Sequence, residues 1–204
     1  MFKSDKSNSS LFSFQMMDNK DYRTSGQWSQ FVNLERYQEA VRNGQLELCR
    51  QIVANSEERN PRCKNGWTPL HWAARAGHYE ICRFILDGSD VEKNPPNVMG
   101  CTPLHIAALK GHANIFKLIA DQVKDKNPAD ETGRTPLHWA AKDSHAEICK
   151  IIVESDSDIS SVNTSGETPL HIARSQGHSD IVELLEAGLE TRLLKSMNSG
   201  EMKS

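Results

Sequence analysis

The residues best suited to chemistry in this chain are its eight histidines. They all occur as pairs seven positions apart: His71/His78, His105/His112, His138/His145 and His171/His178. Histidine is a common metal ligand and a general base near neutral pH. A zinc-binding pair on one helix usually lies four positions apart, or is completed by cysteine or carboxylate ligands. The seven-residue gap here spans a predicted helix break, so we interpret all eight histidines as structural and predict no metal site.

The five cysteines are the other candidates for reactive side chains. Their odd number and the lack of a CxxC pair favour free thiols in a reducing compartment. Cys49, Cys82 and Cys149 share one repeat position, where a buried thiol serves as a small apolar side chain. Cys63 and Cys101 lie near predicted turns, where we expect them to be more exposed, but no histidine or lysine cluster in the sequence indicates that they are reactive. No nucleophile–base set, phosphate loop or paired-carboxylate pattern occurs outside the repeat, so the sequence predicts a protein that is not an enzyme and uses no cofactor or small-molecule substrate.

A repeated motif organises the chain. TPLH begins at Thr68, Thr102, Thr135 and Thr168, at spacings of 34, 33 and 33 residues, and a glycine stands two positions before each threonine. Each copy continues with small residues, a Gly-His pair or its variant, and an apolar run. Five matching positions at one fixed period indicate stacked structural units.

The residues of one unit predict two short helices. Thr68 can cap backbone N–H groups at the start of the first helix, and Pro69 suits the first helical position. Gly77 supplies the left-handed turn that ends this helix, and a second helix follows with apolar residues at helical spacing. Helices of about ten residues are unstable alone. Their apolar faces must therefore be covered by neighbouring units.

Composition limits the classes of protein that this chain resembles. The formal charge of −3 and the pI near 6.2 argue against a protein that coats nucleic acid. No apolar run approaches the ~18 residues that span a bilayer, and the first ten residues lack the apolar core of a secretory signal. We expect a protein of the cytoplasm, or of the cytoplasm and nucleus, with no membrane or nucleic-acid partner.

These motifs resemble those of the ankyrin-repeat family, whose period is 33 residues and whose signature is T-P-L-H-x-A. The resemblance covers roughly residues 34–190 and includes five repeats. In the first repeat Glu35-Arg36-Tyr37-Gln38 replaces TPLH, which suits a polar capping repeat. The resemblance implies an all-α solenoid of stacked helix–turn–helix units with short hairpin-like finger turns. We therefore expect a disordered tail over residues 1–30, a repeat domain over 31–190 and a C-terminal tail over 191–204.

The resemblance also implies where a partner binds. Ankyrin repeats usually bind proteins through the finger tips and the exposed side of the first helices, which form a concave face. By register, the predicted partner-binding residues are Arg42, Asn43, Lys64, Asn65, Trp67, Arg75, Ala76, Val98, Met99, Leu109, Lys110, Glu131, Arg134 and Lys142.

Four basic residues of successive first helices would form a stripe on that face: Arg42, Arg75, Lys110 and Lys142. With apolar anchors at Trp67 and Met99, the stripe suits an acidic or mixed protein segment. In the alternative interpretation, these cations only solubilise an exposed helix face. Trp72 and Trp139, which follow the TPLH histidine, are expected in the core.

Two functional hypotheses follow from the resemblance. The first is a non-catalytic adaptor, scaffold or stoichiometric inhibitor, similar in size to inhibitors of NF-kappaB but without their DSGxxS motif. The second is the recognition part of a larger assembly, such as a ubiquitin-ligase receptor, a channel or a kinase.

Departures from the pattern predict local weaknesses. Asp143-Ser144 replaces the glycine turn of the fourth repeat, which places a non-glycine residue in left-handed backbone, and Arg174 replaces an alanine in the last repeat. The last repeat shows no obvious polar cap, and an apolar tail follows it, either folded back over that repeat or continuing a longer array. The apolar stretch Leu11–Met17 is expected to cover the first repeat, with a docking motif as the alternative.

Overall fold

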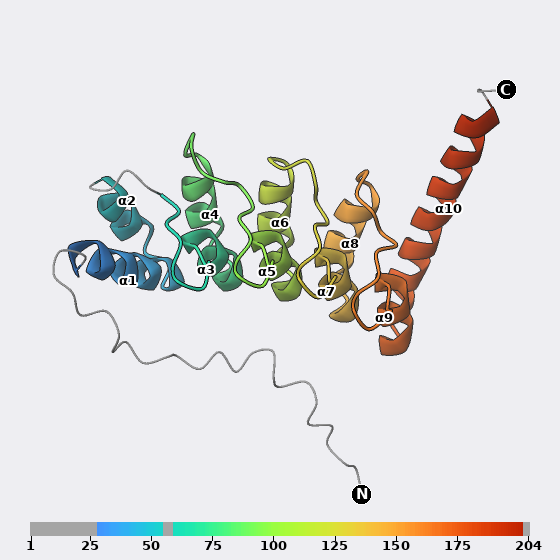
Figure 1. The fold of residues 1–204 in the computed structure, drawn as a ribbon, viewed down its shortest axis with the longest axis horizontal. Helices are drawn as coiled ribbons and strands as arrows, with labels where there is room; N and C mark the ends of the chain where they lie inside the picture. The colour runs from blue at the N-terminus through green and yellow to red at the C-terminus, as the bar shows by residue number, and fades with distance from the viewer. Residues whose placement is uncertain (1–27, 55–58, 202–204) are drawn as a thin grey trace, which may run out of the picture.

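Pairs of antiparallel helices follow one another along the chain and stack side by side (Figure 1). The computed structural model describes residues 28–54 and 59–201, which contain ten helices and no β-strand. The inner helices are α1 (Trp28–Arg42), α3 (Pro69–Ala76), α5 (Pro103–Lys110), α7 (Pro136–Lys142) and α9 (Pro169–Gln176). The outer helices are α2 (Leu46–Ala54), α4 (Tyr79–Leu86), α6 (Ala113–Ala120), α8 (Ala146–Val153) and α10 (Ser179–Glu201). The predicted all-α repeat solenoid is confirmed.

The TPLH motif starts each of the last four inner helices as expected. Thr68 has extended backbone, Pro69 occupies the first helical position, and Gly77 ends the helix with φ 79°. As predicted, the threonine caps its helix, and in all four motifs the threonine and histidine side chains form a capping box. Thr168 accepts a hydrogen bond from the backbone N–H of His171 at 3.2 Å. In every motif the threonine hydroxyl also contacts Nδ1 of the histidine, because that ring turns back onto the cap.

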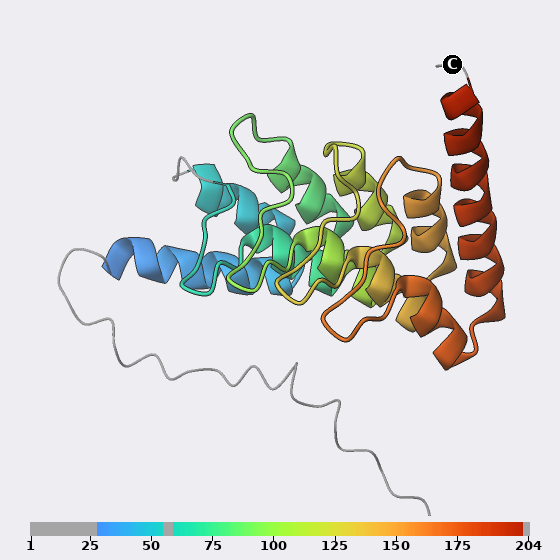
Figure 2. The same ribbon diagram turned by 45° about the vertical axis from the view of Figure 1, so that its right-hand side comes forward.

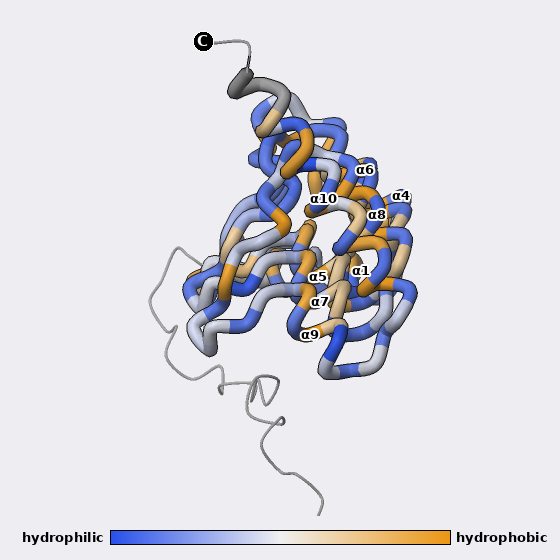
Figure 3. The backbone as a smooth tube through the Cα atoms, turned by 90° about the vertical axis from the view of Figure 1, so that its right-hand side faces the viewer, coloured by the Kyte–Doolittle hydropathy of each residue, from blue (hydrophilic) through white to orange (hydrophobic). Residues whose placement is uncertain are grey.

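The apolar core runs through all five repeats as one cluster. Alanines such as Ala73 and Ala74 are fully buried, so inner helices approach closely, and Ile115, Phe116 and Ile119 of α6 fill the space between layers. Viewed along the stack, the repeats lie behind one another, with inner and outer helices in separate layers (Figure 3). No helix of the described residues is both long and apolar enough to cross a membrane.

The two ends of the stack expose different residues. Leu48 and Ile52 of α2 are half-exposed, although the same positions of later repeats are at most 2% exposed. Those buried equivalents are Ile81, Ile85, Ile115, Ile119, Ile148, Ile152, Ile181 and Leu185. On α1, Arg36 and Glu39 are exposed. The expected polar cap of the first repeat is therefore present on α1 and absent from α2.

The opposite end of the stack is polar. Arg174 of α9 and Glu186 of α10 form an ion pair at 2.6 Å, and they stand where internal repeats have apolar residues facing the next unit. The sequence predicted no polar cap on the last repeat. The two residues of the ion pair are twelve positions apart and meet only through the antiparallel packing of α9 against α10, so their spacing does not predict the contact.

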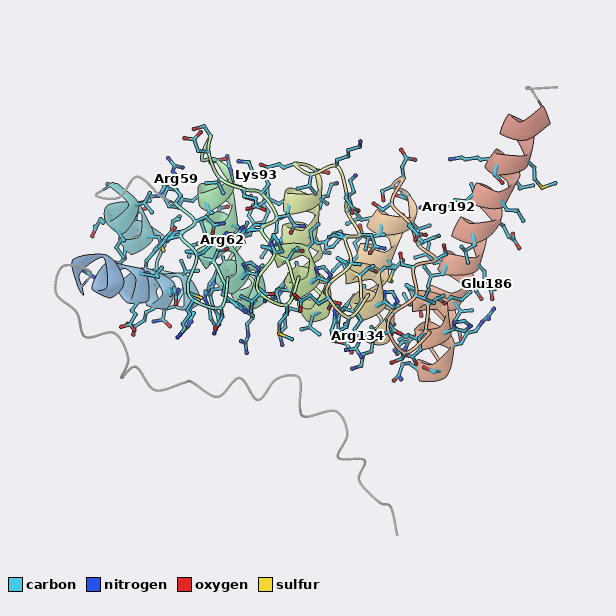
Figure 4. The ribbon with its side chains drawn as sticks, viewed as in Figure 1. Arg59, Arg62, Lys93, Arg134, Glu186 and Arg192 are labelled. Atoms are coloured by element: carbon cyan, nitrogen blue, oxygen red, sulfur yellow. The ribbon has the colours of Figure 1, made fainter. Side chains whose placement is uncertain are left out.

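Helix α10 continues where the sequence predicted a boundary near residue 190. It runs unbroken from Ser179 to Glu201 and rises away from the stack (Figures 1 and 2). Arg192 donates hydrogen bonds to the carbonyls of Val153, Ser155 and Ser157 at the end of α8 (Figure 4). The arginine anchors the helix against the fourth repeat rather than over the fifth.

Beyond that anchor, the apolar residues of the predicted tail lie on the surface. Leu193, Leu194 and Met197 are about 60% exposed. They therefore do not fold back over the last repeat. The predicted apolar stretch Leu11–Met17 and almost all of the predicted disordered tail lie outside the described residues, whereas residues 28–30 already belong to α1.

The irregular turn of the fourth repeat is confirmed. Ser144 has φ 57° and is the single non-glycine residue with positive φ among the described residues. Gly44, Gly77, Gly111 and Gly177 take this conformation at the corresponding turns. The fourth repeat therefore carries backbone strain that the others avoid.

Candidate protein-binding face

The TPLH histidines connect neighbouring repeats. In the second repeat, His71 Nδ1 accepts a hydrogen bond from the backbone N–H of Thr68 at 3.1 Å. Because a backbone N–H only donates, Nε2 must carry the imidazole proton, and it donates to the carbonyl of Cys101 in the next repeat at 3.1 Å. His105 and His138 make equivalent contacts with the carbonyls of Arg134 and Glu167.

Burial keeps these rings neutral. It lowers the pKa of His71 and of His105 to about 4, and it lowers the pKa of His138 as well. A neutral ring with both nitrogens in hydrogen bonds has no free position for a metal. Among residues 28–54 and 59–201, no group of three or more histidine, cysteine or acidic residues could hold a metal ion.

The second histidine of each pair lies at the start of an outer helix. His78, His112 and His145 are the N-cap residues of their helices. His78 Nε2 and His178 Nε2 donate to the carbonyls of Arg42 and Lys142 in the preceding repeats, at 3.0 and 2.9 Å. These contacts give His78 and His178 a structural role, since each links its repeat to the preceding one.

A column of asparagines, missed in the sequence analysis, also supports the inner helices. The side-chain oxygens of Asn60, Asn94 and Asn127 accept hydrogen bonds from the backbone N–H groups of the TPLH leucines, at 2.9 to 3.1 Å. They lie ten residues before each leucine and so share the 33-residue period. That periodicity was the available signal. The fifth repeat has Ser160 at this position.

The finger turns are tied to one another along the stack. Asn97, Asp130 and Asn163 each accept two backbone hydrogen bonds within their own turn. Backbone hydrogen bonds also link successive fingers, from Val98 to Asn65 and from Glu131 to Met99, both at 3.2 Å. The fingers therefore form a continuous, ordered edge.

The predicted finger-tip residues lie on this edge with different exposure. Val98 is 59% exposed and Met99 46%, and Lys64 and Glu131 are exposed as well. Asn65 is half-buried.

The cysteines of these turns are less exposed than expected. Cys63 and Cys101 are half-buried, and burial raises the pKa of the Cys101 thiol to about 12. Cys101 therefore stays protonated near neutral pH and is a poor nucleophile. Its turn packs beneath the next finger, a contact that spacing alone could not reveal.

Trp72 is the centre of one cluster on the inner helices. The guanidinium of Arg42, from the preceding repeat, lies 3.9 Å from the centre of its ring, and that of Arg75 lies 5.7 Å away. Trp67 packs against the same indole with ring centres 4.5 Å apart. Trp72 was predicted to lie in the core. It is half-buried, packing on the core with one side while arginines cover the other.

Arg42 and Arg75 repel each other across the Trp72 ring. Burial, followed by repulsion from Arg75, lowers the pKa of Arg42. Glu39 acts in the opposite direction through space, but no described carboxylate forms an ion pair with either arginine. The positive potential at this point is therefore not locally neutralised.

Trp139 is the centre of a second, looser cluster two repeats further on. Arg134 lies 5.1 Å from the centre of its ring and Lys142 lies 5.6 Å away. Leu109 stands at the position that corresponds to Arg42, and it is half-buried. Trp139 is half-buried like Trp72, so both indoles belong to the surface as much as to the core.

The predicted basic stripe is not a single column. Arg42, Arg75 and Lys142 stand two residues before the turn position of their repeats, whereas Lys110 stands one residue before it, beside Leu109. Lys110 therefore shares its column with the exposed residues Asn43 and Ala76 of the first two repeats. We call the surface formed by Arg42, Trp72, Arg75, Lys110, Arg134, Trp139 and Lys142 the inner face.

Acidic residues gather on the other side of the molecule. The loops after α4 and α8, residues 87–92 and 154–158, each contain three acidic residues and no basic one. Most of these carboxylates are exposed. These two outer loops are therefore acidic, in contrast to the basic inner face.

Comparison with known proteins agrees with this architecture. A family model described as ankyrin repeats (3 copies) matches residues 38–130 and 122–193. Human ankyrin repeat domain-containing protein 39 is 35% identical over 48 residues, which are 24% of this chain and 26% of that protein. The match thus spans about a quarter of the length of this curated relative.

Proposed function

Because the chain belongs to the ankyrin-repeat family, we propose that it is a non-catalytic protein-binding module that holds an acidic segment of a partner on its inner face. Ankyrin repeats are generally protein–protein interaction modules. In this proposal the chain acts as an adaptor, a scaffold or a stoichiometric inhibitor by occupying its partner's segment.

The observation that carries the proposal is the set of cations on the inner face that lack carboxylate partners. Five basic residues contribute: Arg42, Arg75, Lys110, Arg134 and Lys142. None of them forms an ion pair with another described residue. An acidic segment would supply the missing counter-charges, and opposite potentials across an interface favour both fast association and choice of partner.

The stacked arrangement of these cations also favours binding. An arginine held over an indole is already ordered, so less side-chain entropy is lost when it meets a carboxylate. Its planar fork remains available for two parallel hydrogen bonds to that carboxylate. Stacking of an arginine over an indole is not required of a cation that only solubilises a helix.

Charge reversal on the two faces of the same repeats tests the proposal. Arg75→Glu with Lys110→Glu changes the inner face. Arg83→Glu with Lys117→Glu, on exposed positions of α4 and α6, changes the outer helices by the same charge. Partner proteins would be captured from cytosol with each variant and with the unmodified chain, and helix content would be compared by circular dichroism.

We expect the inner pair to weaken partner capture at least about tenfold, which corresponds to ~1.4 kcal/mol, and the outer pair to leave it unchanged. Equal capture by all three chains, or equal loss with both variants, contradicts the proposal.

A further inference from the structure

The two tryptophan clusters of the inner face occupy the same position of repeats that are two steps apart. Trp72 is held between Arg42 and Arg75, and Trp139 lies near Arg134 and Lys142. Between them, the third repeat has the buried Ile106 at the tryptophan position, 4% exposed. The inner face therefore offers two separate cationic centres and not a uniform stripe.

Each centre presents two positive groups to one anion. Arg42 and Arg75 approach the same indole from neighbouring helices, α1 and α3. A carboxylate between two such cations relieves their mutual repulsion and gains charge-assisted hydrogen bonds. The exposed Arg42 and Arg75 side chains lie on the solvent side of the Trp72 ring, where a carboxylate can reach both of them.

The distance between the centres sets the length of the ligand. Packed helices lie roughly 8–10 Å apart, so two steps from α3 to α7 span about 16–20 Å. An extended peptide advances about 3.3 Å per residue and points alternate side chains to opposite sides. Two side chains that face the same way and lie about 20 Å apart are thus about six residues apart.

Resting on the proposed function, we propose that the inner face contains two carboxylate-binding subsites, centred on Trp72 and Trp139, which together select an extended protein segment with acidic residues at positions i and i+6. Arg42 and Arg75 bind one carboxylate. Arg134 and Lys142 bind the other. Linking the two contacts through one peptide makes the second contact intramolecular, so the affinity depends on spacing and not on charge alone.

Synthetic peptides of equal length test the spacing directly. Three of them have equal charge and carry two glutamates in a serine–threonine background, at i and i+2, i and i+6, or i and i+10. Two control peptides carry a single glutamate and no glutamate. Binding to the full chain would be followed by tryptophan fluorescence and calorimetry at low and physiological salt. We expect the i,i+6 peptide to bind about tenfold or more tightly than the other two-glutamate peptides.

Variants of each subsite locate the two contacts. Arg42→Ala and Lys142→Ala should each reduce the affinity of the i,i+6 peptide to nearly that of the single-glutamate peptide. Leu109→Arg should place a cation beside Trp139 where Trp72 has Arg42, and raise the affinity of the i,i+6 peptide about two- to fivefold. Arg83→Ala on α4 serves as the matched control and should have no effect.

The outcomes separate this inference from the proposed function. If all two-glutamate peptides bind equally and better than the single-glutamate peptide, the inner face binds acidic segments but the two-subsite inference is wrong. If no glutamate peptide binds better than a neutral one, both are wrong. If a single-stranded oligonucleotide of equal charge binds more tightly than every peptide, the assignment to a protein segment is overturned.

Discussion

The third and fifth repeats contain the same TPLH motif, but their histidines make different contacts. His105 is 1% exposed and bridges Thr102 to the carbonyl of Arg134 in the following repeat. His171 is exposed, and its ring contacts only Thr168 among the described residues. The same TPLH motif thus forms a hydrogen bond between repeats in the third repeat and only a local helix cap in the fifth.

The difference shows that the motif stabilises a boundary between repeats more than a repeat by itself. In a linear array, stability is the sum of the intrinsic repeat terms and the interfaces between neighbours. Where α9 and α10 present the ion pair Arg174–Glu186, the apolar residues and the buried histidine of an internal interface are absent. The outward face of the last repeat is therefore suited to water.

Replacing His105 and His171 separately by alanine should give the largest difference in the free energy of unfolding. His105→Ala leaves the buried carbonyl of Arg134 and the N–H of Thr102 without partners, and each such loss costs about 1–3 kcal/mol. We expect a decrease of about 3 kcal/mol or more in the free energy of unfolding. His171→Ala should cost less than about 1 kcal/mol, because water replaces its contacts. Urea unfolding followed by circular dichroism measures both, and equal losses would show that the inter-repeat bond is unimportant.

The same contrast should appear as pH dependence. Burial lowers the pKa of His71 and His105 to about 4 from the usual 6.5. Between these values the unfolded chain binds more protons than the native one, so the free energy of unfolding falls as the pH falls. The two rings together should remove roughly 3–4 kcal/mol between pH 7 and pH 5.

Urea unfolding at a series of pH values checks this expectation. His105→Ala should lose about half of the part of the decrease that His71 and His105 contribute, whereas His171→Ala should retain all of it. A free energy of unfolding that is constant from pH 7 to pH 5 would mean that His71 and His105 protonate without weakening their contacts with the next repeat.

Much of the fold was predictable from the sequence because its signals are local and periodic. The TPLH motif, the turn glycines and the apolar runs predict the helix pairs, and Ser144 stands where the left-handed turn was expected. Even the structural role of the histidines followed from their period. The contacts of His71 with Cys101 could not be derived, because they depend on how far one repeat is shifted against the next.

The inner face was less predictable for the same reason. Sequence register placed Arg42 and Arg75 on one surface, but it could not show that both cover the ring of Trp72. Lys110 was predicted to lie on the same face, although it stands one position further along its repeat than Arg42 and Arg75. Side-chain contacts between repeats depend on rotation of about 100° per residue around each helix, so one position of offset changes the neighbours entirely.

The α10 extension was missed for a different reason. Its residues follow the last recognisable repeat, where the periodic pattern no longer predicts structure. The contacts of Arg192 with the carbonyls at the end of α8 depend on the length of α10 and on the close approach of Gly188, where an added Cβ would lie 2.6 Å from Val153.

The smallest expected effect concerns the turn of the fourth repeat. Ser144 has φ 57°, a conformation that costs a non-glycine residue about 1 kcal/mol. Ser144→Gly should therefore raise the free energy of unfolding by about 0.5–1 kcal/mol, the residual entropy of glycine offsetting part of the gain. Urea unfolding gives the total, and hydrogen exchange at the amides of α7 and α8 shows whether the gain is local to this repeat.

Gly111, one repeat earlier, provides the opposite substitution. It has φ 70°, and a Cβ there would lie 2.5 Å from Cε1 of His145. Gly111→Ser should therefore destabilise the chain by more than Ser144→Gly stabilises it, because it adds a clash to the backbone strain. If Ser144→Gly gives no gain while Gly111→Ser is costly, then Ser144 must make a compensating contact with its neighbours, and the fourth repeat would be as stable as the others.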